Sequence, residues 1–197
     1  MKMLQTIAIV LLSTVLASCK LASPSASHTP KSLSPERIEQ IKSEEIREEA
    51  PISWTRYYDN LEQLTEDSTL VIYGRLEQST EEPIEDDSIY AGNNAFVDSR
   101  FQIEEVIYGN APNDDTITIR DLSSGDHLLG GVPFYEDDAN YILFLIKEEG
   151  HHHILGAYQG RFVIREGHVF QQTLEDIQLE DYQPLVYEDF KAALPTN

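Results

Sequence analysis

Cysteine is almost absent from this 197-residue chain, which contains one, Cys19. An internal disulfide therefore cannot form, and the folded part must be stabilised by ordinary core packing. Positive charge is scarce as well, since 14 Lys and Arg stand against 35 Asp and Glu and the formal net charge is −21. Binding to a nucleic-acid backbone requires clustered cations, so we expect no nucleic-acid partner. The acidity is explained by solubility or by adaptation to a salty medium, in preference to a specific cationic partner, and identifies no ligand.

The sequence also lacks a hydrophobic run long enough to span a bilayer. The clearest one is LQTIAIVLLSTVL over residues 4–16. As a helix it would measure about 20 Å, compared with a hydrocarbon core of about 30 Å. Its length, the preceding Lys2 and the small residues that follow are typical of a signal peptide. We therefore interpret residues 1–18 as a cleaved signal.

The tetrapeptide Leu16-Ala17-Ser18-Cys19 ends this segment. It resembles the lipobox of bacterial lipoproteins. The resemblance implies that the Cys19 sulfur receives a diacylglycerol and that Cys19 becomes the new N-terminus. Two acyl chains hold a protein stably, whereas one gives only marginal binding. A protein anchored by lipid to the extracytoplasmic face of the cell membrane is expected, and an ordinary secretory signal with an incidental cysteine is the alternative.

Residues 19–51 are rich first in Ser and Pro and then in charge. The stretch KLASPSASHTPKSLSP has too few large apolar residues to form a core, so we expect a flexible spacer. The stretch ERIEQIKSEEIREE over residues 36–49 places isoleucines near helical spacing and predicts a solvated, marginal helix. We therefore expect a tether over residues 19–51 and a single domain over residues 52–197.

Within that domain, short strands dominate, with one helix near each end. A helix is expected over residues 59–66, and another near the C-terminus through Val186, Phe190 and Leu194. Strands are expected over residues 69–78, 96–109, 116–122 and 140–148, followed by HHHILGAYQ and the hairpin RFVIREGHVFQQ. This series predicts a mainly β fold, a small antiparallel OB-like barrel or sandwich.

Three local features refine this expectation. Residues 79–94 combine acids with turn formers and predict a long exposed loop. The apolar face of the second strand slips at Glu104-Glu105, which predicts a β-bulge. In TITIRDL, Ile117 and Ile119 are expected to point inward, and NYILFLIKE is apolar on both faces, which is typical of the most buried strand.

A longer resemblance rests on DSTLVIYGRL, FQIEEVIYGN, DTITIRDL, NYILFLI and GAYQGRFVI. Their order is similar to that in exported bacterial domains and in the OB-like barrels of netrins and metalloprotease inhibitors. The resemblance covers roughly residues 58–165 and consists of core and turn residues, so it implies a fold rather than an activity. The animal inhibitors depend on disulfides and on a free N-terminal cysteine. This chain offers neither, so protease inhibition is not implied.

The run His151-His152-His153 contains the strongest candidate for ligand chemistry. On a strand, His151 and His153 point to the same face and form a candidate pair for zinc, copper or nickel. Candidate third ligands are His127, His168 and Glu149. A solvated turn is the alternative interpretation of the run.

The other chemistry-bearing stretches are explained by loops and turns. The acidic stretches at 81–87 and 135–140 lack EF-hand spacing. Ser123, Ser124, Asp126 and His127 are hydrolase-like residue types without a nucleophile elbow. We therefore expect no catalytic residue and no cofactor.

The resulting hypothesis is a membrane-anchored extracytoplasmic lipoprotein that acts as a binding or interaction module of unknown ligand, with an envelope protein and a glycan as candidate partners. The alternative is a metal-binding protein or metal-dependent hydrolase that uses His151 and His153. The ligand, the type of cell envelope and the oligomeric state stay open.

Overall fold

The computed structural model describes residues 32–46, 57–84, 94–125, 127–129, 131–156, 158–180 and 182–195. The predicted signal peptide, the predicted lipobox with Cys19, and residues 19–31 and 47–51 of the predicted tether lie outside these residues. Within the described ranges, no helix has the length and hydropathy needed to cross a membrane.

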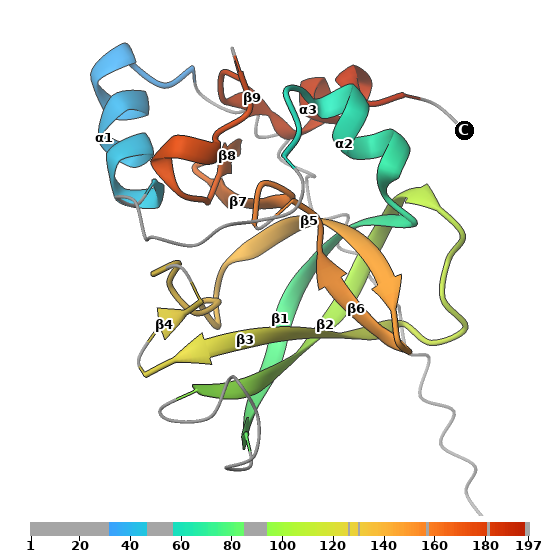
Figure 1. The fold of residues 1–197 in the computed structure, drawn as a ribbon. Helices are drawn as coiled ribbons and strands as arrows, with labels where there is room; N and C mark the ends of the chain where they lie inside the picture. Colours follow the sequence, from blue (N-terminus) through green and yellow to red (C-terminus); the bar gives the residue numbers. More distant parts are fainter. Residues whose placement is uncertain are drawn as a thin grey trace, which may run out of the picture.

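The described part is mainly β, with nine strands in one mixed sheet. The helices are α1 (Pro35–Glu45), α2 (Leu61–Asp67) and α3 (Tyr187–Ala193), with a 3-10 turn at Glu175–Ile177. The strands are β1 (Leu70–Pro83), β2 (Asn94–Gly109), β3 (Thr116–Ser124), β4 (His127–Leu128), β5 (Asn140–Glu148), β6 (His151–Ile154), β7 (Arg161–Arg165), β8 (His168–Gln171) and β9 (Leu185–Val186). Figure 1 shows the three helices gathered at the end that contains β7, β8 and β9, with β1, β2 and β3 toward the other end.

Five strands close into a barrel-like ring in the order β1, β2, β3, β6, β5 and back to β1. They are not spaced evenly around an axis. Most pairs are antiparallel, but β3 and β6 are parallel, with Ile119 opposite His152. The predicted mainly β, OB-like class is therefore confirmed, with the difference that the sheet is mixed. Strands β7, β8 and β9 continue the sheet beyond β5.

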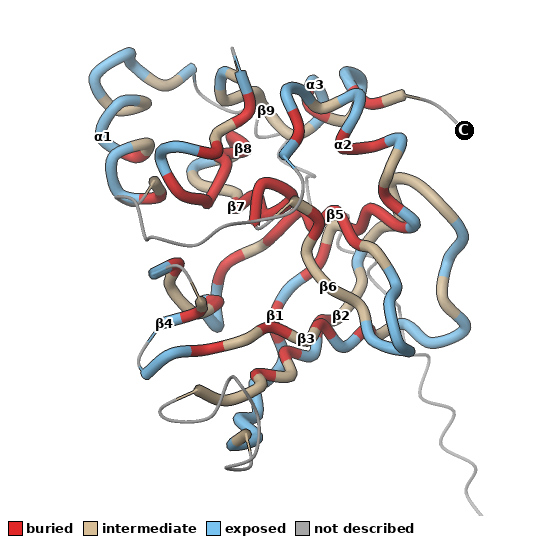
Figure 2. The backbone as a smooth tube through the Cα atoms, viewed as in Figure 1, coloured by how far each residue is buried: buried red, intermediate tan, exposed pale blue. Residues whose placement is uncertain are grey.

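Strand β5 separates two apolar clusters and is buried on both faces, as its sequence predicts. Residues 141–145 are all 0% exposed. Their odd-numbered side chains enter the cluster inside the ring, and their even-numbered side chains enter the cluster beneath α2 and α3. Figure 2 shows the buried residues concentrated along β5 and the elements that cross it. Because successive side chains of β5 point to opposite faces, this strand packs both into the interior of the ring and into the layer covered by α2 and α3.

The long pair β1 and β2 contains the β-bulge that the sequence predicts. Glu104 is the extra residue, because Tyr73 pairs with Glu105 and Gly74 pairs with Ile103. At Gly74 an added Cβ would lie 2.5 Å from a main-chain oxygen of β2. Only glycine therefore permits this close approach of the two strands.

The predicted loop at residues 79–94 is wrong at its start, whereas its end agrees with the structure to within one residue. β1 continues to Pro83 and β2 begins at Asn94, and the hydroxyls of Ser79 and Ser99 form a 3.0 Å hydrogen bond between the two strands. Residues 79–83 are turn formers and acids. They nevertheless form a strand, because main-chain pairing in an exposed two-stranded extension does not require apolar side chains. Hydropathy alone could not reveal this extension.

Helix α1 belongs to the folded domain, although the sequence predicts a flexible tether over residues 19–51. Ser34 caps the helix by accepting from the main-chain N–H of Arg37 (3.3 Å). Ile41 is 1% exposed and enters the main core cluster. At the other end of the helix, Glu45 accepts a 2.7 Å hydrogen bond from Nε of Arg165 on β7. Tertiary packing stabilises a helix that would be marginal by itself.

Replacing Leu143 with Ala should lower the free energy of unfolding by about 2–5 kcal/mol, because the core around β5 cannot fully close the cavity left behind. Denaturant unfolding followed by circular dichroism measures the change. Thr118→Ala, at an exposed position on β3, is the control and should cost less than about 1 kcal/mol. Equal unfolding midpoints for Leu143→Ala and the parent would contradict the central position of β5.

Candidate functional site: a groove between α2 and β9

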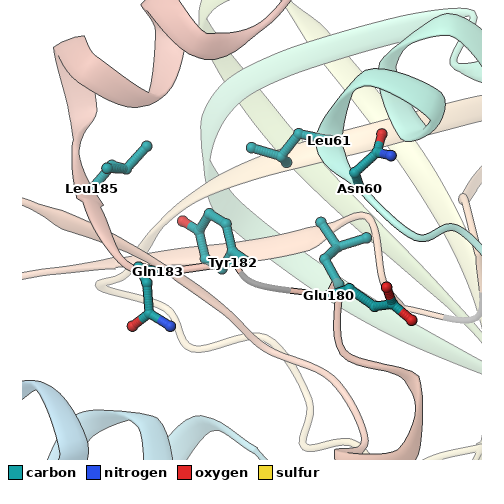
Figure 3. Close-up of a pocket in the computed structure, with 7 residues that line it drawn as sticks. Asn60, Leu61, Glu180, Tyr182, Gln183 and Leu185 are labelled. Carbon is teal, nitrogen blue, oxygen red and sulfur yellow. The ribbon is translucent and has the colours of Figure 1, made fainter.

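A shallow groove opens between the start of α2 and the segment that leads into β9 (Figure 3). Its volume is about 320 Å³. The lining residues are Asn60, Leu61, Leu179, Glu180, Tyr182, Gln183 and Leu185. Three leucines and a tyrosine supply apolar surface, and two amides and a carboxylate supply hydrogen-bonding groups. A mostly apolar concavity with a few polar groups is the usual composition of a ligand-binding site.

A buried glutamine fixes the α2 side of the groove. The Gln159 side chain, 1% exposed, pairs with both main-chain groups of Tyr58. Its Oε1 accepts from the Tyr58 N–H (2.8 Å), and its Nε2 donates to the Tyr58 carbonyl (2.7 Å). Two residues later, Asn60 caps α2 by accepting from the N–H of Gln63 (3.0 Å). The turn after β6 therefore determines where α2 begins and where Leu61 lies.

A second glutamine fixes the opposite side. Oε1 of Gln171 accepts from the main-chain N–H of Leu179 (3.0 Å), and Nε2 of Gln171 donates to the carbonyl of Gln159 (2.9 Å). The N–H of Glu180 donates to the carbonyl of Asp59 (2.9 Å), which ties the two sides together. The groove is therefore held open by main-chain and buried side-chain bonds rather than by exposed contacts.

Tyr182 offers the groove mainly the apolar surface of its ring. Its hydroxyl donates to the main-chain carbonyl of Val169 (2.8 Å), and burial raises the pKa of Tyr182. The ring contacts Phe162 and Phe190, with centroids 5.4 Å and 6.2 Å away. A tyrosine held at both ring and hydroxyl is pre-organised, so a ligand that packs on it does not have to immobilise it.

Acidic residues lie on the α2 side of the groove. Glu180 lines it, and Asp59 and Glu62 flank the lining residues of α2. On the Gln183 side the rim contacts a cation, because Lys42 Nζ donates to Gln183 Oε1 (3.1 Å). Glu180 is thus the charged member of the described lining, and its carboxylate favours a cationic group in the ligand.

The predicted histidine pair lies elsewhere, on β6. His151 and His153 share a face as predicted, with ring centroids 6.4 Å apart. Nδ1 of His153 lies 2.8 Å from the carbonyl oxygen of Arg120, which leaves Nε2 for any other ligand. Beside the pair, Asp98 has both oxygens held by Arg120, at 2.7 and 2.6 Å, and these bonds lower the pKa of Asp98.

Among the residues that the structure describes, no third ligand joins this pair to form a metal site. In the described ranges there is no group of three or more His, Cys, Asp or Glu side chains arranged to hold a metal ion. His168, one of the candidate third ligands, is buried in the β7–β8 hairpin with Nδ1 3.3 Å from the carbonyl of Glu166. Metal binding at His151 and His153 stays a prediction, and so does lipidation of Cys19, which lies outside the described residues.

Sequence reasoning missed a buried polar cluster inside the ring. It contains Asp121 of β3, Arg161 at the start of β7, and Tyr135 and Tyr158, each no more than 7% exposed. Burial raises the pKa of Asp121 to about 6, with Arg161 opposing the rise and Asp98 adding to it. Asp121 is in phase with inward-pointing Ile117 and Ile119, and that alternation is the signal that could have located it. Enclosure of the cluster favours a structural role over catalysis.

Comparison of the chain with protein-family models, with curated proteins and with solved structures gives no match.

Asp121 should increase the free energy of unfolding as pH falls, which is the opposite of the effect of an ion-paired carboxyl group. As pH falls through about 6, the folded chain binds a proton that the unfolded chain binds only near the ordinary pKa of 3.8. The Asp121 contribution to stability therefore rises as pH falls through this window, by at most about 3 kcal/mol. Relative to Asp121→Asn, the parent should gain stability between pH 8 and pH 4 in denaturant unfolding. Asp98→Asn is the control with the opposite sign, because Arg120 lowers the pKa of Asp98.

If the free energy of unfolding changed with pH by the same amount in the parent and in Asp121→Asn, the raised pKa of this buried carboxyl would be contradicted.

Proposed function

We propose that this chain is a lipid-anchored extracytoplasmic lipoprotein whose β domain binds a basic segment of a protein partner in the groove between α2 and β9. The anchor is supported by the Leu16-Ala17-Ser18-Cys19 tetrapeptide. The binding function is supported above all by one observation, a pre-organised and mostly apolar groove that has Glu180 in its lining.

The lining determines which kind of segment fits. Leu61, Leu179, Leu185 and the Tyr182 ring favour an apolar side chain of the partner. Burial of one large apolar side chain stabilises a complex by about 1.5–3 kcal/mol. Glu180 and the neighbouring acids favour Lys or Arg beside that apolar residue and speed encounter with a basic partner. An acidic or uncharged partner would lose this electrostatic attraction.

The same lining favours binding over catalysis. Its polar side chains are Asn60, Glu180, Gln183 and the inward-bonded hydroxyl of Tyr182. No serine, cysteine, histidine or lysine is among these described lining residues, so they do not supply a nucleophile paired with a base. Asp121, whose pKa is strongly shifted, is enclosed inside the ring and does not line the groove.

Replacing Cys19 with Ser should abolish lipid attachment, because the hydroxyl does not accept the diacylglycerol that the thiol accepts. Labelling of cells with radioactive palmitate, followed by gel analysis, measures both incorporation and processing. Ser18→Ala is the matched control, since it keeps a small residue before Cys19 and should still be labelled. Equal labelling of the Cys19→Ser protein and the parent would refute the lipoprotein assignment.

Glu180→Lys should weaken peptide binding at least about tenfold, because it reverses the charge on the groove rim. The probe is a fluorescent peptide of alternating Leu and Arg, titrated into the mature protein by anisotropy. Glu81→Lys makes the same charge change at an exposed site on β1 and should leave the affinity nearly unchanged.

Two outcomes would reject the groove as this binding site. One is equal weakening by Glu180→Lys and Glu81→Lys, which would indicate only non-specific attraction to a negative surface. The other is equal affinity of the parent for a Leu and Glu peptide of the same length. Binding of a soluble cell-wall glycan fragment without binding of either peptide would favour the glycan partner instead.

A further inference from the structure

Helix α1 contacts the same segment that lines the groove. We call residues 178–180 and 182–185 the rim segment. Its residues in the groove lining are Leu179, Glu180, Tyr182, Gln183 and Leu185. Leu179 and Tyr182 also line a cavity of about 10 Å³, together with Lys42 and Ile46 at the end of α1. The groove and the contact with α1 therefore share part of the rim segment.

One hydrogen bond joins α1 directly to the groove lining. Nζ of Lys42 donates to Oε1 of Gln183 (3.1 Å). Figure 3 shows the Gln183 amide directed away from Leu61, which lies on the opposite side of the groove. The Gln183 side chain is therefore held by a residue of α1 that does not itself line the groove.

A second connection runs through two neighbouring glutamines. Glu45 of α1, 5% exposed, accepts a hydrogen bond from Nε2 of Gln172. The preceding residue, Gln171, accepts from the main-chain N–H of Leu179 in the rim segment (3.0 Å). A displacement of α1 would leave the Glu45 carboxylate and the Gln172 amide without this bond, directly beside the residue that fixes Leu179.

The docking of α1 is a local interaction that can open without unfolding the domain. The helix packs against β8 (Figure 1), and two of its eleven residues, Ile41 and Glu45, are buried. At its exposed start, Arg37 donates to Glu166 (2.8 Å). A helix of this length is marginal by itself, so α1 is stable when docked and unstable when released. Such elements open at a lower free energy than the whole domain.

We propose that docking of α1 and ligand binding in the groove stabilise each other. Docked α1 fixes the rim segment through Lys42 and Glu45, so a ligand that packs on this segment binds the docked state more tightly. Because such coupling is reciprocal, a bound ligand holds α1 in place. Since α1 lies between Cys19 and the groove along the chain, occupancy of the groove affects the segment next to the proposed lipid anchor. The ligand half of this inference rests on the function proposed for the groove.

Glu45→Lys tests the support of the rim segment. It places an ammonium group against Arg165, whose Nε donates to Glu45 in the parent (2.7 Å), and should release α1. Hydrogen exchange of the mature protein, followed by mass spectrometry of peptic fragments, measures the effect. Exchange should become faster in α1 and in the rim segment and stay slow in β5. Glu44→Lys makes the same charge change at the exposed neighbouring position and should leave both segments as in the parent.

The peptide of alternating Leu and Arg tests the reciprocal effect. It should slow exchange in α1 of the parent, although no residue of α1 is among the described lining residues of the groove. Glu45→Lys should bind the peptide at least about fivefold more weakly than Glu44→Lys, which has the same net charge.

Faster exchange in α1 of Glu45→Lys with parent-like exchange in the rim segment would overturn the proposal. Parent-like exchange in both segments, or peptide binding without slower exchange in α1, would overturn it as well. If the parent does not bind the peptide, the function proposed for the groove fails, and the exchange comparison still decides whether α1 supports the rim segment. If β5 exchanges rapidly in Glu45→Lys, that variant is unfolded. Arg37→Glu, which places two carboxylates together at the exposed contact with Glu166, then decides by the same comparison.

Discussion

A guanidinium group completely enclosed in the core constrains how this molecule is built. Arg161 is 0% exposed and is always charged, so the surrounding chain must supply acceptors for it. Two come from the main-chain carbonyls of Pro133 and Phe134, which forces the connection before β5 to fold across the ring. The aromatic face of Tyr135 covers the guanidinium from the same segment. One side chain therefore ties the irregular segment before β5 to β7.

The groove likewise depends on buried polar side chains that bind main-chain groups, in this case the amides of two glutamines. Gln159 and Gln171 lie in the core and use their side chains to bind main-chain groups of the segments that form the two sides of the groove. Buried amides of this kind are costly if unpaired, so the segments they bind cannot move independently. This explains how a shallow surface feature made from loop residues and a short helix keeps a defined shape, which a binding function requires.

Much of the fold could be predicted, because the spacing of apolar residues along a segment indicates which side chains are buried. The alternation in TITIRDL places Ile117 and Ile119 inward, and Glu166-Gly167 turns the last hairpin with positive φ at both residues. Phe190 and Leu194 are buried by the C-terminal helix as their spacing predicts. The exposed ribbon at residues 79–83 and helix α1 could not be predicted in the same way. Their stability comes from main-chain pairing and from tertiary contacts that local hydropathy does not contain.

The sequence by itself determined the mainly β class, the strand buried on both faces and the bulge at Glu104, because each depends on which side chains alternate along a single segment. It also contains the tetrapeptide Leu16-Ala17-Ser18-Cys19 and an excess of acidic residues, which are properties of order and composition. Only the tertiary structure decided that Asp121 and Arg161 lie in one buried cluster and that Leu61 and Leu185 line one groove. These pairs are far apart along the chain, and their proximity results from ring closure and from bonds made by buried glutamine and arginine side chains, which no local pattern encodes.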